Sequence, residues 1–388
     1  MGAGAVVVVL PHSTSSTSAP VATNPSAAAS RSATPKPTIA PTPAPTFTAA
    51  GDMAQPRSSF TATLLTDGRV LVAGGFIARD AATKKDTVTN TAEIYDPATG
   101  KFTATGKMTS PRAKQVATLL ADGRVLISGG TNGSYRLGTA EVYDPVKGKF
   151  TATGAMRASR VEHTATLLPS GKVLLAGGWD STTHLATAEL YDPATNKFTA
   201  TGAMLVGRGE SVAGLLPDGT VIIAGGATTD KTALTEAEIY NPATGKFTAT
   251  AAMSLQRQYS SGVVMADGRF LVAGGFDKDF FTEDSAEVYD PAKGIWTDTG
   301  SMIEAKASNA IVLLPSGSVA LVGGFGATYD QSATQIFDPV TMTFSPEAEM
   351  ITSREYCEAV TLKDGRILVV GGTSSTATIL KSAELFGN

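Results

Sequence analysis

Residues 61–75 read TATLLTDGRVLVAGG, and variants of this stretch recur through most of the chain. The stretch holds an apolar run, the pair Asp67-Gly68, a second apolar run and the double glycine Gly74-Gly75. Asp-Gly supplies the positive φ angles that a type I′ hairpin turn requires. Nearly continuous apolar runs are typical of strands that are covered on both faces. The stretch therefore predicts a buried β-hairpin.

The double glycine occurs seven times, and a methionine precedes each copy. The glycine pairs are Gly74-Gly75, Gly129-Gly130, Gly177-Gly178, Gly225-Gly226, Gly274-Gly275, Gly323-Gly324 and Gly371-Gly372. The methionines are Met53, Met108, Met156, Met204, Met253, Met302 and Met350, with spacings of 55, 48, 48, 49, 49 and 48 residues. A fixed period of this length indicates a solenoid, a propeller or an array.

Each repeat is predicted to form four antiparallel strands. In the first repeat these are residues 61–65, 69–73, 92–95 and 101–104, and the turn between the last two reads DPATG. Proline fixes φ in such a turn, and the final glycine allows a left-handed residue. Four strands per repeat describe a propeller blade. The predicted fold is therefore all-β, a seven-bladed propeller over residues 46–388.

The pattern of four hydrophobic residues, Gly-Gly and spaced aromatics such as Tyr95 and Phe102 resembles the kelch motif. It is similar to repeats of bacterial kelch proteins and of the galactose-oxidase central domain, and the resemblance covers residues 46–388. Seven concordant copies make the resemblance specific for the fold. Function depends on sites placed on that fold, so the resemblance says less about function.

The two ends of the repeat region predict how the ring closes. The last repeat stops at residues 383–388 and lacks a fourth strand, while residues 46–49 form an orphan copy of one. We expect this N-terminal strand to complete blade seven and to remove an exposed sheet edge. An open array with frayed ends is the alternative.

A basic residue follows each repeat methionine by four positions, and an acidic residue lies in each third strand. The basic residues are Arg57, Arg112, Arg160, Arg208, Arg257, Lys306 and Arg354. The partners are Glu93, Glu141, Glu189, Glu238, Glu287, Gln335 and Glu384. Both patterns change together in the sixth repeat. This predicts six partly buried bidentate Arg–Glu pairs, with a weaker polar contact in blade six; a ring of ligand-binding arginines is the alternative.

Residues 1–45 differ from the repeats, because they hold 8 Pro, 13 Ser/Thr and 10 Ala and no acidic residue. Such a segment cannot bury enough apolar surface to offset its ordering entropy, which predicts a disordered tail or linker. The apolar run at residues 6–10 could belong to an export signal or anchor, although no basic region precedes it. Ser/Thr/Pro-rich stalks commonly hold domains at surfaces, which favours an extracellular or cell-surface location.

Composition excludes several classes of function. The net charge of −4 argues against nucleic-acid binding, which needs a basic face. The single cysteine, Cys357, excludes an internal disulfide framework and a Cys-rich zinc site, and three histidines leave little for a metal centre. We therefore expect no cofactor and no metal, and a monomeric chain. Asp277, Asp279, Glu283 and Asp284 are acidic and close in sequence, but they lack EF-hand spacing.

The repeats vary at one end of each blade, and this end is where we expect the ligand. The two positions that begin each innermost strand should line the mouth of the central channel, and the loops after Gly-Gly should surround them. An aromatic and polar concavity at this place suits a ligand. The predicted ligand-binding residues are Lys114, Gln115, Glu162, His163, Trp179, Glu210, Tyr259, Asn309 and Tyr356. Titration of His163 is expected to make binding depend on pH between about 5 and 7.5.

The resemblance to galactose oxidase raises the question of copper-radical chemistry, which in that family uses two His and two Tyr ligands, one Tyr being crosslinked to Cys. We do not expect a matching ligand set here, because His163 and His184 share one repeat and Cys357 stands next to Tyr356. We also expect no counterpart of the family's C-terminal domain, which supplies a ligand. A nucleophilic pair of Cys357 and His163 would need residues of blades seven and three to meet. We expect neither chemistry.

The first prediction of function is a non-enzymatic binding module for a protein or glycan at the channel mouth. The alternative is a carbohydrate-active enzyme, a mutarotase, epimerase or hydrolase-like activity, that uses Glu162 and Glu210 as an acid–base pair. Kelch-type mutarotases of sialic acid make this alternative reasonable. A purely structural surface protein, tethered through the N-terminal tail, is the third class.

Overall fold

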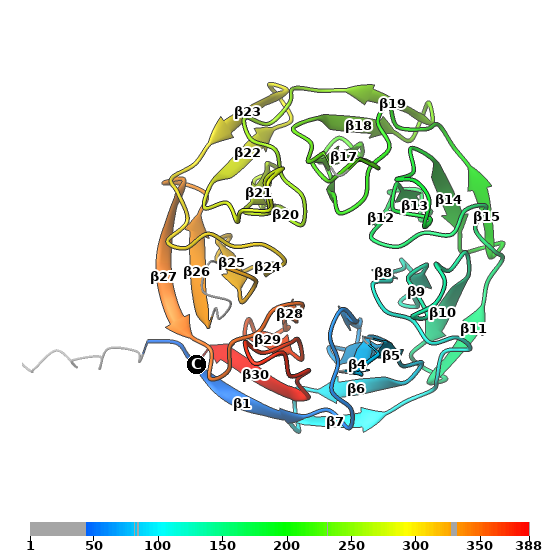
Figure 1. Cartoon of the computed structure of the whole chain (residues 1–388), viewed down its shortest axis with the longest axis vertical. Coiled ribbons are helices and arrows are strands. Elements are labelled where there is room, and N and C mark those ends of the chain that lie inside the picture. Colours follow the sequence, from blue (N-terminus) through cyan, green and yellow to red (C-terminus); the bar gives the residue numbers. More distant parts are fainter. Residues whose placement is uncertain (1–43, 81, 84, 231, 327–331, 388) are drawn as a thin grey trace, which may run out of the picture. The chain divides into compact units, whose positions relative to one another are not determined.

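The computed structural model describes residues 44–80, 82–83, 85–230, 232–326 and 332–387. Seven four-stranded antiparallel sheets form blades around a central axis (Figure 1). The prediction of an all-β, seven-bladed propeller is confirmed. The described residues contain no helix, and hence none long and apolar enough to cross a membrane. Most of the predicted tail, residues 1–43, lies outside the described part of the chain.

Each blade runs from an innermost strand at the axis to an outermost strand at the rim. The innermost strands are β2 (Thr61–Leu64), β8 (Val116–Leu119), β12 (Thr164–Leu167), β16 (Val212–Leu215), β20 (Ser261–Val264), β24 (Ala310–Leu313) and β28 (Glu358–Thr361). The second strands are β3 (Val70–Ala73), β9 (Val125–Ser128), β13 (Val173–Ala176), β17 (Val221–Ala224), β21 (Phe270–Ala273), β25 (Val319–Val322) and β29 (Ile367–Val370). The third strands are β6 (Ala92–Asp96), β10 (Ala140–Asp144), β14 (Ala188–Asp192), β18 (Ala237–Asn241), β22 (Ala286–Asp290), β26 (Ala333–Asp338) and β30 (Ser382–Gly387). The outermost strands are β7 (Lys101–Ala104), β11 (Lys149–Ala152), β15 (Lys197–Ala200), β19 (Lys246–Ala249), β23 (Ile295–Asp298), β27 (Thr343–Glu349) and β1 (Thr46–Asp52).

The turn between the first two strands differs in type from the prediction. Gly68 has a φ of 93°, whereas Asp67 is not among the residues with positive φ. The Gly68 N–H donates to the carbonyl of Leu65, and the Asp67 carboxylate accepts the backbone N–H of Arg69 at 3.0 Å. This is a three-residue loop in which a left-handed glycine follows an ordinary turn, so only the glycine needs a positive φ.

The N-terminal strand closes the ring, as predicted. In blade seven the strand order is β28-β29-β30-β1, and Phe47 lies opposite Phe386 in the antiparallel pairing. Their ring centroids are 5.0 Å apart, which matches the 4.9 Å separation of Tyr95 and Phe102 in blade one. Closure therefore reproduces the blade's own aromatic contact with residues from the two ends of the domain, and it leaves no blade with an unpaired third strand.

The hydrophobic core lies between neighbouring blades. One cluster joins Leu71 and Ile94 of blade one to Val125, Ile127 and Tyr143 of blade two, and all five are at most 5% exposed. Each of the seven repeat methionines is buried as well. The blades thus depend on their neighbours for burial, as in other repeat architectures.

The predicted Arg–Glu pairs are present in six blades, but they are fully buried, and each arginine bonds only one of the two carboxylate oxygens. The Arg160 guanidinium is completely buried and donates to Glu189 Oε1 at 2.8 Å. The other oxygen of Glu189 accepts the backbone N–H of Arg157 at 2.9 Å. Each arginine also donates to strand-end carbonyls, such as those of Gly177 and Thr187. The pair therefore braces one blade internally, and no arginine of this ring faces the channel.

Blade six differs, as predicted, although its two residues do not bond each other in the way we expected. Lys306 donates to the carbonyl of Ala333 and Gln335 accepts the backbone N–H of Ile303 at 2.6 Å. Burial lowers the pKa of Lys306 to about 8. The Gln335 side chain keeps one of the two roles of the usual glutamate, which is to bind the chain after the repeat methionine.

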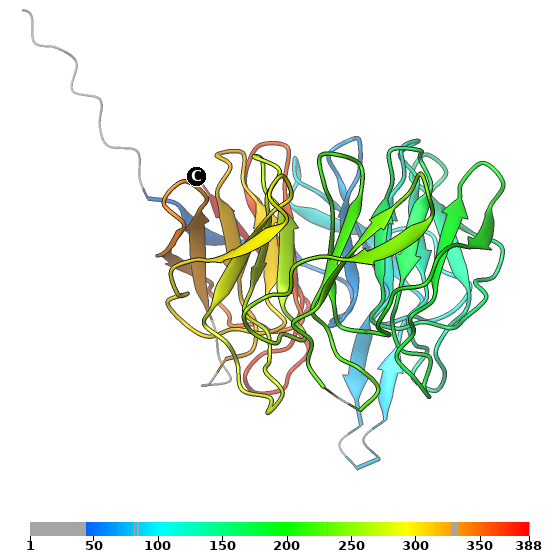
Figure 2. The ribbon, with the colours of Figure 1, turned by 90° about the horizontal axis from the view of Figure 1, so that it is seen from above.

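One face of the ring carries the variable loops and a projecting hairpin. The hairpin consists of β4 (Phe76–Arg79) and β5 (Asp86–Val88) and accounts for the long first spacing. Figure 2 shows it extending beyond the other loops on that face. We call this face the channel-mouth face.

Candidate functional site

Seven residues, one from each blade, form a ring at the channel mouth and share one unusual backbone conformation. They are Ser59, Lys114, Glu162, Glu210, Tyr259, Ser308 and Tyr356, and their φ angles lie between 50° and 58°. Backbone hydrogen bonds run from blade to blade around this ring. For example, Lys114 N donates to Ser59 O at 2.8 Å and Ser308 N donates to Tyr259 O at 3.0 Å. The propeller therefore imposes this conformation by its symmetry.

The side chains at these seven positions do not suit their backbone. A positive φ favours Gly, Asn and Asp, and other residues pay about 1–3 kcal/mol there. None of the seven residues is Gly, Asn or Asp. Residue types that the backbone disfavours point to a role for the side chains themselves, which makes this ring the first candidate site.

Four of the seven side chains meet in one polar cluster, which comes from blades two to five. Lys114 Nζ forms an ion pair with Glu162 Oε1. The Tyr259 hydroxyl donates to Glu210 Oε1 at 2.9 Å and lies 3.2 Å from Glu162 Oε1. One hydroxyl thus connects the two carboxylates that were predicted to act together. We call these four residues the channel-mouth cluster.

The cluster contains a carboxyl that titrates near neutrality. Burial, followed by the charge of Glu162, raises the pKa of Glu210 to about 7. Burial and the same two carboxylates also raise the pKa of Tyr259 above its ordinary value, so it stays a neutral donor. At neutral pH the cluster can therefore hold a proton on Glu210 beside the lysine-paired carboxylate of Glu162.

Three residues of the cluster, Lys114, Glu162 and Tyr259, line a cavity of about 280 Å³ at the channel mouth. Tyr356 and Glu358 also line it. Glu358 begins β28, where the other innermost strands begin with Thr, Val, Ser or Ala. Burial raises the pKa of Glu358 to about 8. The sequence analysis overlooked this residue, although comparing the first positions of the seven inner strands would have revealed it.

Three residues that were predicted to line the mouth are almost fully buried. Gln115, His163 and Asn309 follow the ring residues directly, and they are only 5–7% exposed. Gln115 Nε2 donates to the carbonyl of Ala73 in the preceding blade at 2.8 Å. A Cβ atom on Gly129 would lie 2.8 Å from the His163 ring. The first glycine of each pair thus leaves room for a neighbour's side chain. Gln115 and Asn309 still border the cavity, and each carries a buried oxygen without a hydrogen-bond partner.

The expected titration of His163 is wrong. Its Nε2 lies 2.9 Å from Ser128 Oγ, and burial lowers the pKa of the imidazole to about 3. The ring therefore remains neutral over the range in which we expected it to change charge. Nor does it form a pair with Cys357, whose thiol has a pKa raised by burial to about 12 and lies 3.9 Å from the carbonyl of Arg354.

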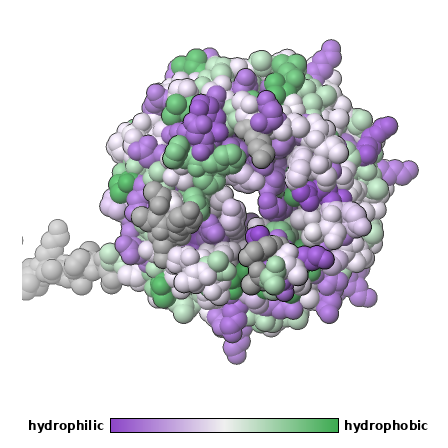
Figure 3. Space-filling model, viewed as in Figure 1, coloured by the Kyte–Doolittle hydropathy of each residue, from purple (hydrophilic) through white to green (hydrophobic). Residues whose placement is uncertain are grey.

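Aromatic side chains surround the mouth on two sides. Tyr356 is 40% exposed in the cavity, and Phe280 and Phe281 are 54% and 70% exposed on a loop of blade five. The rings of Phe276 and Tyr259 are nearly perpendicular, with their centroids 6.2 Å apart. Trp179 lies outside the channel cavity, in a neighbouring pocket. Figure 3 shows the central opening with hydrophobic surface over blade five beside it.

Comparison with known proteins identifies the repeat. The family model described as the kelch motif matches residues 57–109, 112–157, 164–205 and 259–303, which are blades one, two, three and five. The chain is a seven-bladed β-propeller that carries kelch motifs in these four blades. No curated protein matches this chain in sequence.

A solved structure similar to this propeller is a fungal alcohol oxidase of the AA5 family, in complex with copper. The TM-score is 0.72 at 18% identity, and the match covers 88% of this chain and 76% of that one. At this identity the similarity shows the fold alone. Within the described residues, no three His, Cys, Asp or Glu side chains gather in a way that could hold a metal ion. His163 is turned into a blade interface and His184 stacks on Trp179 at 6.3 Å, so these residues do not fit a copper site.

The acidic segment near Asp277 does not form a cation site in the described structure either. Asp277 Oδ1 accepts the backbone N–H groups of Asp279 and Phe281, both at 2.8 Å, and thereby caps its own turn. Asp279 forms an ion pair with Lys278. These carboxylates are occupied by local contacts.

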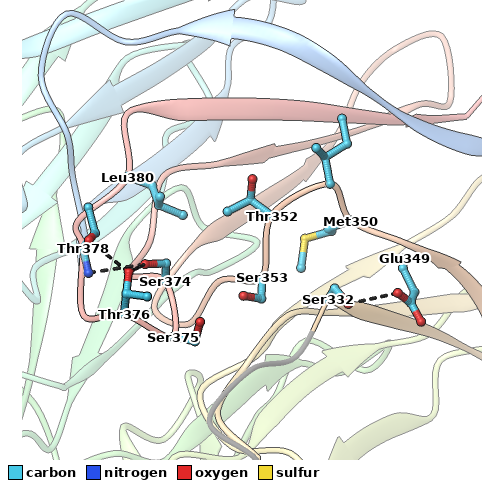
Figure 4. Close-up of a pocket in the computed structure, with 11 residues that line it drawn as sticks. Ser332, Glu349, Met350, Thr352, Ser353, Ser374, Ser375, Thr376, Thr378 and Leu380 are labelled. Atoms are coloured by element: carbon cyan, nitrogen blue, oxygen red, sulfur yellow. Dashed lines mark hydrogen bonds between the residues drawn. The ribbon is translucent and has the colours of Figure 1, made fainter.

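A larger groove, of about 750 Å³, lies between blades six and seven, away from the channel cavity (Figure 4). Hydroxyl groups dominate its lining. Ser374, Thr376 and Thr378 bond one another at 2.9 and 3.1 Å, and Ser332 donates to Glu349 at 3.3 Å. Among its described lining residues the groove has one charged side chain, Glu349, and no aromatic side chain, so the channel-mouth face remains the better candidate site.

Proposed function

We propose that this kelch propeller is a non-enzymatic binding module whose site is the channel-mouth cavity, and that its ligand is a glycan. The observation that carries the proposal is the channel-mouth cluster, in which four polar side chains from four blades meet. Each of these residues has a positive φ angle that its residue type disfavours. Carboxylates, a phenol and an ammonium group bind sugar hydroxyls well, because they offer both acceptors and donors. A cavity of about 280 Å³ suits one sugar unit better than a broad protein surface. Residues 1–45 would hold the module at a cell surface or outside the cell.

A glycan array followed by calorimetric titration tests this proposal. We expect Tyr259→Phe to weaken binding about ten-fold or more, because it removes the hydroxyl that connects the two carboxylates. The double change Glu162→Gln with Glu210→Gln should abolish binding. Both variants should keep the circular-dichroism spectrum of the folded propeller, since the cluster lies at the solvent-facing end of the channel.

The matched control lies on the opposite face, in the turn that begins at Asp218. Its carboxylate accepts the backbone N–H of Thr220 at 2.9 Å. Asp218→Ala should lower stability slightly and leave affinity unchanged. A ligand complex that places the sugar on the Asp218 face, or full binding by the double variant, would refute the proposal. A protein partner recovered with undiminished binding to the double variant would refute it as well.

A second candidate is an enzyme acting at the anomeric centre of a sugar, as a mutarotase or epimerase. The observation that favours it is the raised pKa of Glu210 beside the lysine-paired Glu162. An acid and a base of different protonation at one site are what proton transfer requires. Because both carboxylates contact the hydroxyl of Tyr259, they lie closer together than the roughly 6.5–9.5 Å of inverting hydrolases. NMR of freshly dissolved sugars would reveal accelerated mutarotation, which Glu210→Gln should abolish.

A further inference from the structure

A separate pocket opens beside the channel mouth, and we call it the side pocket. Its volume is about 220 Å³. Phe76 and Asp86 of the β4–β5 hairpin form one wall, and Trp179 and Arg136 belong to loops of blades three and two. Only blade one carries such a hairpin among the described blades, so the pocket exists because this repeat is longer than the others.

Arg136 is the unusual residue of the side pocket. Its guanidinium carbon lies 4.3 Å from the centroid of the Trp179 ring, which is a cation–π contact. Its Nε atom is buried and has no hydrogen-bond partner, and no carboxylate in the described part of the chain pairs with it. The buried arginines of the repeat, such as Arg160, bond a carboxylate and carbonyls instead. The guanidinium group of Arg136 thus packs on an aromatic ring and lacks an acidic partner among the described residues.

The other charges that line the side pocket already have partners. Lys114 forms an ion pair with Glu162, and Asp86 lies 3.8 Å from Arg79. The charge of Arg136 is therefore the uncompensated one, and it would favour an anionic group in the pocket. A guanidinium fork matches the two oxygens of a carboxylate in a bidentate pair.

The side pocket and the channel-mouth cavity are adjoining parts of one surface. Lys114 and Glu162 line both of them. A ligand held by the channel-mouth cluster can therefore reach Arg136 past these two residues.

We propose that the side pocket binds the carboxylate of the ligand, so that the ligand is an acidic sugar of the hexuronic acid class. The inference rests on the proposed function and adds the charge of the ligand to it. Arg136 pairs with the carboxylate, Trp179 holds the guanidinium in place, and the channel-mouth cluster binds the sugar hydroxyls.

The test compares sugars that differ only at C6. Glucuronate is titrated against glucose, and galacturonate against galactose, using saturation-transfer NMR and calorimetry on the full-length chain. We expect the acid of at least one pair to bind about ten-fold or more tightly than its neutral counterpart, from the contribution of a charge-assisted hydrogen bond. Arg136→Gln should remove this preference and leave the weaker affinity for the neutral sugar. Arg136→Lys should restore only part of it, because lysine keeps the charge but not the fork.

Arg157→Gln is the matched control, because Arg157 is exposed and its side chain makes no hydrogen bond or ion pair within the described structure. It should keep the preference. Equal affinity for acid and neutral sugar in both pairs would overturn the inference and leave the proposed function standing. A preference that survives in Arg136→Gln would also overturn it. Absence of binding to any of the four sugars, or Arg136-dependent binding of an acidic peptide alone, would refute the inference and the glycan proposal together.

Discussion

The buried arginine of blade three permits a quantitative test of what holds a blade together. Arg160 is fully buried and donates to Glu189 at 2.8 Å, to Gly177 O at 2.8 Å and to Thr187 O at 2.9 Å. Arg160→Ala removes these bonds and leaves the Glu189 carboxylate buried without its counter-charge. Breaking a buried pair in this way costs about 3–5 kcal/mol. We expect the free energy of unfolding, measured by urea denaturation, to fall by about that amount.

A double-mutant cycle separates the pair from the cavity that the alanine creates. If the two residues stabilise each other, Arg160→Ala and Glu189→Ala together should cost about 1–3 kcal/mol less than the sum of the single changes. Blade six supplies the control, since the chain itself uses Lys306 and Gln335 at these positions. Arg160→Lys combined with Glu189→Gln should therefore cost less than Arg160→Lys alone. A coupling energy below about 0.5 kcal/mol, or a double swap that is worse than the single change, would refute the reasoning.

Further predictions concern ring closure and the titrating carboxyls. Deleting residues 1–43 should leave the melting temperature nearly unchanged, whereas deleting residues 1–52 should lower it strongly, because Phe47 leaves its contact with blade seven; equal melting temperatures would contradict this. The pKa of Glu210 is raised in the folded state. The contribution of this carboxyl to the free energy of unfolding is therefore fully present below about pH 4.5 and is lost as pH rises through about 7. Glu210→Gln should then raise the free energy of unfolding at pH 8 by about 1–3 kcal/mol and change little at pH 4.5. Glu358→Gln should act in the same direction through a pKa of about 8, and urea unfolding of both variants across this pH range measures the two effects.

The fold was predictable because each structural demand is repeated seven times in one chain. The first glycine of each pair marks a place where the neighbouring blade leaves no room for a Cβ, as at Gly129, where it would lie 2.4 Å from Arg160 O. The second glycine is packed in the same way against its own blade, as Gly130 is against Ala113 O. The ring closure could be predicted for the same reason. Phe47 stands in blade seven where Phe102 stands in blade one, and the last repeat has no fourth strand of its own. The turn at Asp67 was assigned the wrong type because the dipeptide Asp-Gly suits more than one loop, and the loop length decides between them.

The grouping of variable residues at the channel mouth was predictable, but their contacts were predictable only in part. Comparison of the repeats predicted that the variable residues lie at the channel mouth, and Glu162, Glu210 and Tyr259 do meet there. It could not show that the residue after each rim position turns into the blade interface, because a left-handed residue changes the direction of the chain. His163 was misassigned for this reason. Arg136 was missed because it contacts Trp179, a residue of another blade, and no spacing along the chain reveals that contact.

The distribution of rim side chains adds a final argument about where the ligand lies. A seven-fold ring offers seven equivalent positions, yet the charged rim residues Lys114, Glu162 and Glu210 all come from blades two, three and four. The side pocket adjoins the same sector, since Arg136 and Trp179 belong to blades two and three. A ligand centred on the axis would meet one strongly polar side and one side of serines and tyrosines. A ligand that uses both cavities must instead lie off the axis over blades two and three, where the uncompensated arginine and the paired carboxylates can be reached together.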